Sequence, residues 1–178
     1  LRFHPDCWHG PSARRHPALV AIIEGADGFA IHRTYLRPNG TGKADLDGGD
    51  KLMLGATAGG AVRLTEAQGP LVVAEGIETA LSLASGLLGH PATIWAALST
   101  SGMRGLRLPP SPGRLTIASD GDDPGRAAGH DLAERAHALG WTVSMLTAPE
   151  GRDWGDILEW QLTENTPGRF PYTAGVYP

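Results

Sequence analysis

The sequence has almost no cysteine, because Cys7 stands alone among 178 residues. A disulfide framework and a zinc site built from several cysteines are therefore excluded. No uninterrupted apolar run approaches the ~18 residues that a membrane span needs, and no signal peptide opens the chain. We therefore expect a cytoplasmic protein that does not insert into a membrane.

An excess of basic residues is missing as well. The chain has 15 Lys and Arg against 19 Asp and Glu, which gives a net charge of −4. A protein that binds nucleic acid through bulk charge alone would be basic, so the overall charge argues against that mode of binding. With 41% hydrophobic and 19% charged residues, the composition is typical of a folded chain.

The first part of the chain, residues 1–69, is predicted to form a small antiparallel β unit. Residues 1–16 show no periodicity, so we expect them to form a loop. Short strand candidates follow, separated by turns rich in glycine: 17–24 (PALVAIIE), 28–37 (GFAIHRTYLR), 51–55 (KLMLG) and 60–64 (GAVRL). The glycines between the first two candidates predict a hairpin.

From residue 70 to residue 163 the pattern changes to strands that alternate with helices. The predicted strands are 71–75, 93–98, 114–120 and 142–149, and helical periodicity follows three of them. This alternation predicts an α/β fold with a mostly parallel, Rossmann-like sheet flanked by helices. Ligands of such sheets bind at the carboxyl ends of the strands. Residues 164–178 are expected to form an irregular tail.

Acidic side chains gather at these predicted strand ends. They are Glu75, the last residue of the first strand, Asp120, Asp122 and Asp123 at the end of the third, and Asp153 and Asp156 just after the fourth. Like charges at one edge of a sheet raise one another's pKa unless a cation neutralises them. Oxygen ligands without cysteine or paired histidines favour Mg²⁺ or Mn²⁺ over zinc. Gly121 would allow a tight turn, so that two carboxylates could face one ion.

Helix capping is the alternative use of the same acids. Asp123 is a candidate N-cap, because Pro124 suits the first helical position. Asp153 and Asp156 have the spacing of a pair resembling a capping box. Glu78 would complement the helix dipole as a surface residue of the first turn.

Three segments together resemble a known family. LVVAEGIETALSL (71–83), IASDGDDPG (117–125) and EGRDWGDIL (150–158) resemble the Toprim domain of bacterial primases, type IA and type II topoisomerases and OLD-type nucleases. The family's hallmarks are a glutamate after one strand and D-x-D after a later one, here Glu75 and Asp120 with Asp122. The resemblance covers about residues 70–160 and is greatest for the phage- and plasmid-type (DnaG-like) primase branch. The stretch from HRTYL to GAVRL looks like the segment that precedes Toprim in that branch.

The resemblance implies metal-dependent nucleotidyl transfer, with primer synthesis from NTPs on a single-stranded DNA template. Asp120 and Asp122 would bind Mg²⁺ (or Mn²⁺), Glu75 would bind metal or serve as acid–base, and Asp153 and Asp156 would complete the cluster. The chain would be part of a larger primase-like protein of a mobile element, with a zinc-binding domain and possibly a helicase domain. The alternatives are a metal-dependent nuclease of OLD type and a non-catalytic module that binds nucleic acid.

The basic residues include candidates for contact with phosphates. They are Lys43, Arg33, Arg104, Arg126 and Arg152, of which Arg126 and Arg152 adjoin the acidic motifs. The loop around Lys43 does not match a P-loop, because Arg37 and Ala44 stand where the motif needs Gly and Ser or Thr. If the six acids belong to a metal site, 15 bases face 13 other acids, so the net charge no longer argues against a nucleic-acid partner.

Overall fold

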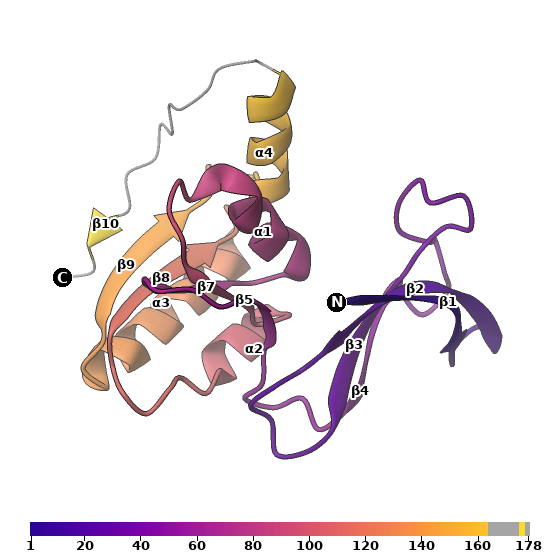
Figure 1. Ribbon diagram of the computed structural model, residues 1–178, viewed down its shortest axis with the longest axis horizontal. Helices are drawn as coiled ribbons and strands as arrows, with labels where there is room; N and C mark the ends of the chain where they lie inside the picture. Colours follow the sequence, from indigo (N-terminus) through magenta and orange to yellow (C-terminus); the bar gives the residue numbers. More distant parts are fainter. Residues whose placement is uncertain (164–174, 177–178) are drawn as a thin grey trace. The chain divides into compact units, whose positions relative to one another are not determined.

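The computed structural model describes residues 1–163 and 175–176. The chain divides into two compact units, Leu1–Ala58 and Gly59–Pro178 (Figure 1). Each unit is built around its own sheet. No helix in the described part of the chain is long and apolar enough to cross a membrane.

The first unit is a four-stranded antiparallel sheet in the order β1-β2-β3-β4. Its strands are β1 (Arg2–His9), β2 (Arg14–Ile22), β3 (Ala30–Tyr35) and β4 (Lys51–Gly55). The predicted hairpin is confirmed as β2 and β3, which pair from Ala18 opposite Tyr35 to Ile22 opposite Ile31.

The prediction of a loop over residues 1–16 is wrong, because they form β1 and the start of β2. Strand β1 lies at the edge of the sheet, and six of its eight residues are exposed. It therefore lacks the alternation of apolar and polar residues that identifies a half-buried strand. A bulge between His4 and Cys7 shifts its register further.

Buried polar groups hold the interior of this unit together. The ring of His9 is fully buried, with Nδ1 2.8 Å from Ser12 Oγ and Nε2 3.0 Å from the Gly49 carbonyl. A carbonyl only accepts, so Nε2 carries the proton and Nδ1 accepts from Ser12. The hydroxyl of Tyr35 donates to the Trp8 carbonyl at 2.6 Å, and burial raises the pKa of this phenol above its usual value.

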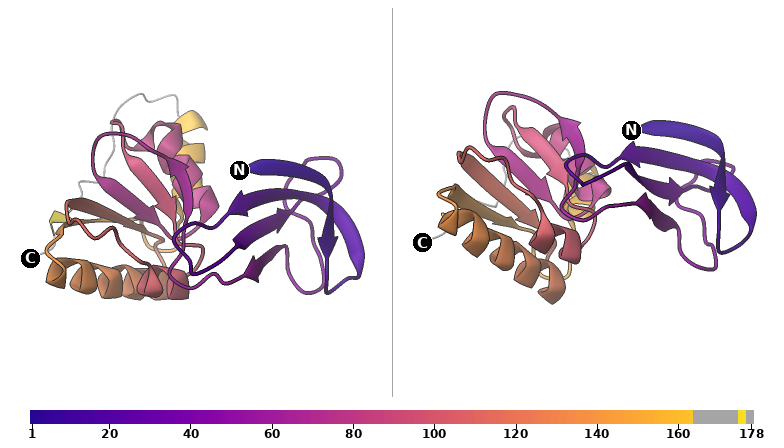
Figure 2. Two further views of the ribbon diagram at one scale, coloured as in Figure 1. Left: turned by 60° about the horizontal axis from the view of Figure 1, so that its bottom comes forward. Right: turned by 90° about the horizontal axis from the view of Figure 1, so that it is seen from below.

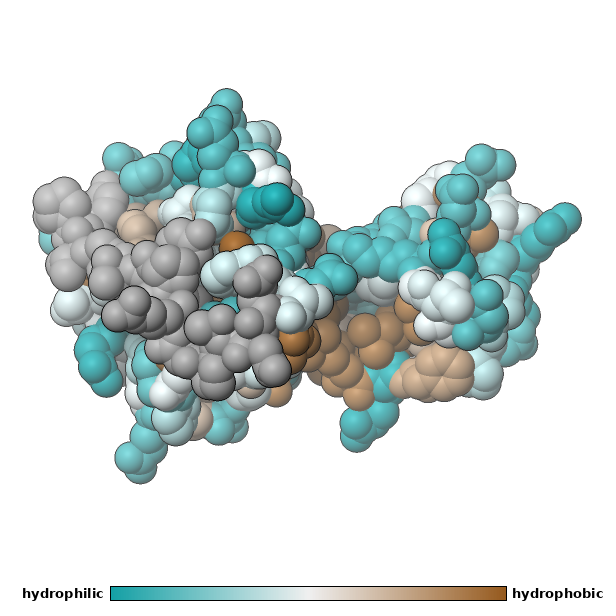
Figure 3. Space-filling model, turned by 90° about the horizontal axis from the view of Figure 1, so that it is seen from above, coloured by the Kyte–Doolittle hydropathy of each residue, from teal (hydrophilic) through white to brown (hydrophobic). Residues whose placement is uncertain are grey.

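Large apolar side chains also remain at the surface of this unit. Figure 3 shows apolar residues in brown among the exposed atoms of the first unit. The large exposed hydrophobic residues of its strands and loops include Phe3, Trp8, Ile22, Phe29, Met53 and Leu54. Exposed apolar side chains that gather on one small unit mark it as a candidate for binding another molecule.

The second unit contains a six-stranded sheet in the order β10-β9-β8-β6-β7-β5. The four inner strands are parallel: β6 (Leu71–Ala74), β7 (Thr93–Ala96), β8 (Arg114–Ser119) and β9 (Thr142–Thr147). The predicted α/β architecture with a mostly parallel sheet is thus confirmed. Within the tail expected to be irregular, Gly175–Val176 form the short strand β10 antiparallel to β9, and the rest of it lies outside the described residues.

The GAVRL segment, which we predicted in the N-terminal β unit, belongs to this second sheet. It forms strand β5 (Val62–Thr65), which pairs antiparallel with β7. Short strand candidates carry no information about their partners, so the pattern could not assign this one to a sheet. Ala61 and Val62 are each 1% exposed, and Ala61 packs into the core of the second unit.

Helices cover both faces of the parallel sheet (Figure 2). They are α1 (Ile77–Ser82), which continues as one π-helical turn η1 (Leu83–Leu87), α2 (Thr100–Gly105), α3 (Asp123–Ala138) and α4 (Trp154–Thr163). Helices α2 and α3 lie together on one face, and α1 and α4 lie together on the other. The six residues of α2 are too few for a clear helical period, so the sequence did not predict this helix.

Candidate active site

Glu75 and Asp120 lie at the same edge of the sheet because their strands are direct neighbours. Strands β6 and β8 pair in parallel from Leu71 opposite Leu115 to Ala74 opposite Ala118. Glu75 follows β6 by one residue, and Asp120 follows β8 by one residue. The parallel pairing of β6 and β8 therefore places both acids at the carboxyl ends of neighbouring strands, as we expected from the sequence.

Gly125, in the first turn of α3, marks the point where the acids converge. A Cβ atom placed on it would lie 2.8 Å from Asp122 Oδ1 and 3.2 Å from Glu75 Oε2. The carbonyl of Asp120 would lie 3.1 Å from the same point. A side chain at this position would therefore crowd the carboxylate oxygens. Glu75 Oε2 is buried, whereas Asp122 is exposed, so the group opens to solvent on one side.

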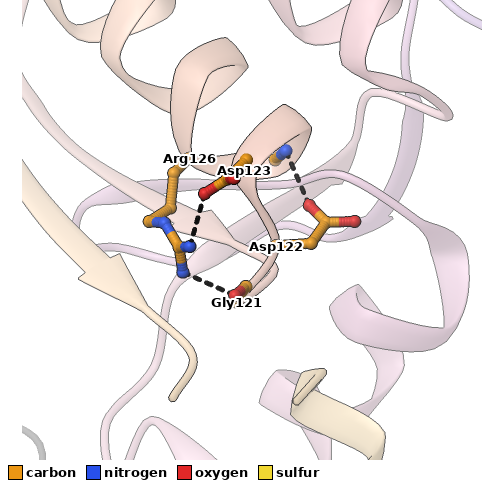
Figure 4. Close-up of polar contacts among 5 residues, drawn as sticks. Gly121, Asp122, Asp123 and Arg126 are labelled. Carbon is orange, nitrogen blue, oxygen red and sulfur yellow. Dashed lines mark hydrogen bonds and ion pairs between the residues drawn. The ribbon is translucent and has the colours of Figure 1, made fainter. Parts of the chain in front are cut away.

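Asp122 caps helix α3, and this differs from the prediction that Asp123 would do so. Its Oδ1 accepts from the backbone N–H of Gly125 at 2.7 Å (Figure 4). Asp123 is instead the first helical residue, with a side chain that is 95% exposed. Its Oδ1 pairs with Arg126 Nη2 at 2.7 Å, and Arg126 Nη1 also donates to the Gly121 carbonyl.

Thr79 fixes one oxygen of Asp120, and sequence reasoning missed it. Its hydroxyl donates to Asp120 Oδ1 at 3.1 Å, and the residue is 4% exposed. It lies on α1, four residues after Glu75. The signal in the sequence would have been a hydroxyl side chain within an otherwise apolar helix. Such a group needs a hydrogen-bond partner when it is buried.

Gly121 is required for a close approach of two loops rather than for a tight turn. A Cβ atom on it would lie 1.8 Å from the Pro149 carbonyl oxygen. Its N–H donates to the Arg152 carbonyl at 2.9 Å, and its own carbonyl accepts from Gly151 N–H at 3.0 Å. Its φ angle is not among the positive ones, so the backbone conformation does not demand glycine. This packing brings the loop after β9 against the D-x-D turn.

Asp153 and Asp156 form the predicted reciprocal pair at the start of α4. Asp153 Oδ1 accepts from Asp156 N–H at 2.9 Å, and Asp156 Oδ2 accepts from Asp153 N–H at 3.3 Å. Trp154, between them, is fully buried, and its indole donates to the Ser119 carbonyl at 3.2 Å. The indole anchors the start of α4 to the end of β8, so the pair stays beside the D-x-D turn.

The donor chemistry of this edge fits a hard divalent cation. Carboxylates are the oxygen ligands that Mg²⁺ and Mn²⁺ take in proteins. Glu75, Asp120 and Asp122 are the residues that could hold such an ion, because side-chain oxygens of Glu75 and Asp122 and the backbone carbonyl of Asp120 all lie near Gly125. Among residues 1–163 and 175–176, however, no three acidic, histidine or cysteine side chains already stand together as a ligand set. Small side-chain rotations would be needed to bring three carboxylates onto one ion.

The predicted phosphate-binding residues are dispersed. Arg126 is held by Asp123 and Gly121, and Arg152 is 64% exposed with Nη1 3.9 Å from Asp156 Oδ2. Both flank the acidic edge. Arg104, on α2, pairs through Nε with Asp131 of α3 at 2.5 Å.

The other two predicted residues, Arg33 and Lys43, lie in the first unit. Arg33 donates from Nη1 to the Trp8 carbonyl at 3.1 Å, so its guanidinium braces the sheet. Lys43 is exposed on the loop after β3 and forms an isolated bridge with Leu36.

Comparisons with known proteins agree with this fold. The family described as Toprim domain (Toprim_3) matches residues 70–164, which is more than half of the chain. A second family, described as a domain of unknown function (DUF7146), matches residues 1–64.

Solved structures of primases share the fold. The chain is similar to a DNA primase domain from Pseudomonas aeruginosa, with a TM-score of 0.53 and 19% identity over 89% of this chain and 52% of that one. It is also similar to the Aquifex aeolicus primase (zinc-binding and RNA polymerase domains), with a TM-score of 0.57 and 16% identity over 84% of this chain and 38% of that one. The chain thus spans about half of these proteins or less, and identities this low show the fold alone.

Curated proteins match only a short segment. The fused isobutyryl-CoA mutase of Geobacillus kaustophilus is 49% identical over 39 residues, which are 22% of this chain and 4% of that protein. The mutase of Cupriavidus metallidurans is 47% identical over 38 residues, again 4% of its length. A match of this extent carries no activity to this chain. The Toprim match over more than half of the sequence, together with the primase-like fold, shows that the chain belongs to the Toprim family.

Proposed function

We propose that this chain performs metal-dependent nucleotidyl transfer, with primer synthesis from NTPs on single-stranded DNA. Residues 70–163 would be the catalytic Toprim part of a larger, DnaG-like primase of a mobile element. A zinc-binding domain and a helicase domain would accompany it in the full protein. The cofactor would be Mg²⁺ or Mn²⁺.

One observation carries the proposal: Glu75 and Asp122 approach the same point beside the Asp120 backbone. Two carboxylates from different strand ends meet there, at the start of a 16-residue helix. The positive end of the helix dipole partly offsets their repulsion, and a cation would offset the rest. Metal ions in such sites stabilise the charge that develops on phosphate oxygens during transfer.

Metal binding, proton transfer and phosphate contact would each fall to particular residues of the chain. Asp120 and Asp122 would hold the ion, with Asp120 oriented by Thr79. Glu75, whose Oε2 is buried, would bind the ion or accept the proton of the attacking 3′-hydroxyl. Arg152, which is 64% exposed beside Asp156, would contact the phosphates of the nucleotide or template. Asp153 and Asp156 would add the outer carboxylates of the cluster.

The direct test is synthesis on a template. The protein is incubated with a single-stranded oligodeoxynucleotide, labelled NTPs and Mg²⁺ or Mn²⁺, and the products are separated on a denaturing gel. We expect labelled oligonucleotides from the native chain and a loss of at least about 100-fold after Asp120→Asn with Asp122→Asn, because removal of metal ligands removes the charge stabilisation. Glu134→Gln, an exposed carboxylate on the same helix α3, is the matched control and should retain full activity.

The same experiment distinguishes primer synthesis from the nuclease alternative. Shortened template with no new oligonucleotide, lost in the same double variant, would mean phosphodiester cleavage at this site. Full activity of the double variant would overturn the assignment of the residues. A primer annealed to the template tests nucleotide addition without initiation.

A non-catalytic nucleic-acid-binding module is the second candidate, and one observation favours it. Within residues 1–163 and 175–176, no three potential ligands are already gathered, and Asp122, Asp153 and Asp156 all use oxygens in helix caps. Template binding that is independent of divalent metal, with neither synthesis nor cleavage, would support this candidate.

A further inference from the structure

Arg126 joins the backbone of the D-x-D turn to the first turn of helix α3. Its Nη1 donates to the Gly121 carbonyl, and its Nη2 donates to Asp123 Oδ1 at 2.7 Å (Figure 4). Its backbone N–H donates to the Asp122 carbonyl at 3.0 Å. One residue thus has hydrogen bonds to three consecutive residues of the turn. We name the two side-chain bonds the Arg126 bridge.

The Gly121 carbonyl is a point where α3 meets the loop after β9. Besides Arg126, it accepts from Gly151 N–H at 3.0 Å, and the N–H of Gly121 donates to the Arg152 carbonyl at 2.9 Å. A carbonyl oxygen has two lone pairs, so both of its bonds can form at once. Gly121 is the middle residue of D-x-D, so the orientation of the whole turn depends on Arg126 as well as on that loop.

The guanidinium of Arg126 is engaged within the turn. The side chain is 34% exposed, and both of its terminal nitrogens donate to acceptors there. A phosphate would therefore compete with bonds that already exist. The Asp123 carboxylate is 95% exposed, so its ion pair alone contributes little. The bond from the charged guanidinium to the partly buried Gly121 carbonyl is the stronger part of the bridge, and Asp123 orients the guanidinium for it.

We propose that Arg126 is a positioning residue of the metal site and not a phosphate ligand. By holding the Gly121 peptide, it fixes the backbone that carries Asp120 and Asp122, and so the directions of their carboxylates. Contacts outside the ligand set determine how well the ligands are oriented toward a metal. The inference rests on the proposed function, because it concerns the same acids, and it replaces the expectation that Arg126 contacts phosphate.

The direction of the change in Mn²⁺ affinity separates positioning from a simple effect of charge. Arg126 carries a positive charge beside the acids, so Arg126→Gln lessens the repulsion of a cation and, by charge alone, tightens binding. Loss of positioning acts in the opposite direction. Asp123→Ala removes a negative charge, so charge alone weakens binding there. Only the loss of a shared bridge weakens binding in both variants.

Calorimetric titration of the 178-residue chain with Mn²⁺ provides the test. We expect Arg126→Gln and Asp123→Ala each to weaken binding by at least about threefold, near the lower end of couplings within one hydrogen-bond network. The double variant should bind no more weakly than the weaker single variant, because both changes break the same bridge. Arg126→Lys keeps the charge but not the planar fork of donors, so it should resemble Arg126→Gln. Asp131→Ala, which removes an exposed acid of α3 paired with Arg104, is the matched control and should keep the native affinity.

The kinetics of extension of an annealed primer give a second readout. For Arg126→Gln, or for Arg126→Lys if the first variant does not fold, we expect an unchanged KM for NTP and a loss of activity that excess Mn²⁺ restores. Unchanged or tighter Mn²⁺ binding in Arg126→Gln, or a raised KM for NTP, would overturn the inference. If the native chain makes no primer, the proposed function fails, and weakened Mn²⁺ binding in both single variants still supports the role of Arg126. A native chain that binds no Mn²⁺ would overturn both.

Discussion

Asp122 serves the fold and the proposed chemistry with different oxygens. Oδ1 caps α3 through Gly125 N–H, and Oδ2 is left for a ligand. An acid at an N-cap also lies at the positive end of the helix dipole, which interacts favourably with negative charge. Capping and metal binding are therefore compatible in this residue, although the sequence presents them as alternatives. Asparagine would preserve the cap and remove the charge, because both residues are good N-caps.

Thr79 should control the affinity of the site for metal through Asp120. Thr79→Val removes the hydroxyl that fixes Asp120 Oδ1 and keeps a side chain of similar shape. We expect Mn²⁺ affinity to fall by about 10-fold, the lower end of the effect of lost outer-shell hydrogen bonds, and Thr79→Ser to restore it. Calorimetric titration with Mn²⁺ measures this.

Ser82→Ala provides the matched control for Thr79. Ser82 is a buried hydroxyl on the same helix, and it donates to the Glu78 carbonyl rather than to the acidic group. Its removal should leave Mn²⁺ affinity unchanged. Equal affinity of the native chain and Thr79→Val would refute the role of Thr79 while leaving the metal site itself in place.

The loops after β8 and β9 form one structure, and this determines where the acidic motifs lie. Gly121 allows the loop at Pro149 to pack against the D-x-D turn, and Trp154 fastens α4 to Ser119. Backbone hydrogen bonds thus hold the second acidic motif beside the first. The sequence showed the motifs and their order but not this contact, because it depends on loops that are distant in the chain.

Gly121→Ala should destabilise this arrangement. A Cβ atom 1.8 Å from the Pro149 carbonyl oxygen cannot be accommodated without backbone movement. We expect the free energy of unfolding to fall by more than about 2 kcal/mol in urea denaturation, within the range for steric overpacking. Gly105→Ala, where nothing lies within 4 Å, is the control and should change stability by less than about 0.5 kcal/mol. Equal stability of the two variants would contradict the close approach.

The elements that the sequence predicted well are the buried parallel strands. Strand β6 is buried at every position, and such continuous apolar runs are readily identified. Strand β1, with six exposed residues, and the six-residue helix α2 have no such pattern. The assignment of β5 to a sheet failed for another reason, since pairing is a long-range property.

Across the whole chain, the acidic excess lies in the second unit. Residues 1–58 have 7 Lys and Arg against 6 Asp and Glu, whereas residues 59–178 have 8 against 13. The six acids expected at the site all belong to the second group. This distribution agrees with the proposal that the second unit holds cations. The Toprim family was accessible from sequence because three motifs occur in order, but the roles of individual acids depend on oxygens that only the structure places.

Calorimetric titration with Mn²⁺ of the native chain and of the Asp120→Asn, Asp122→Asn double variant tests the metal site most directly. Because the Asp122→Asn substitution would preserve the cap of α3, a difference in binding reports on the ligands rather than on folding. We expect saturable binding to the native chain and to the Glu134→Gln control, and its loss in the double variant. Absence of binding to the native chain, or equal binding to the double variant, would contradict a metal site at this edge of the sheet.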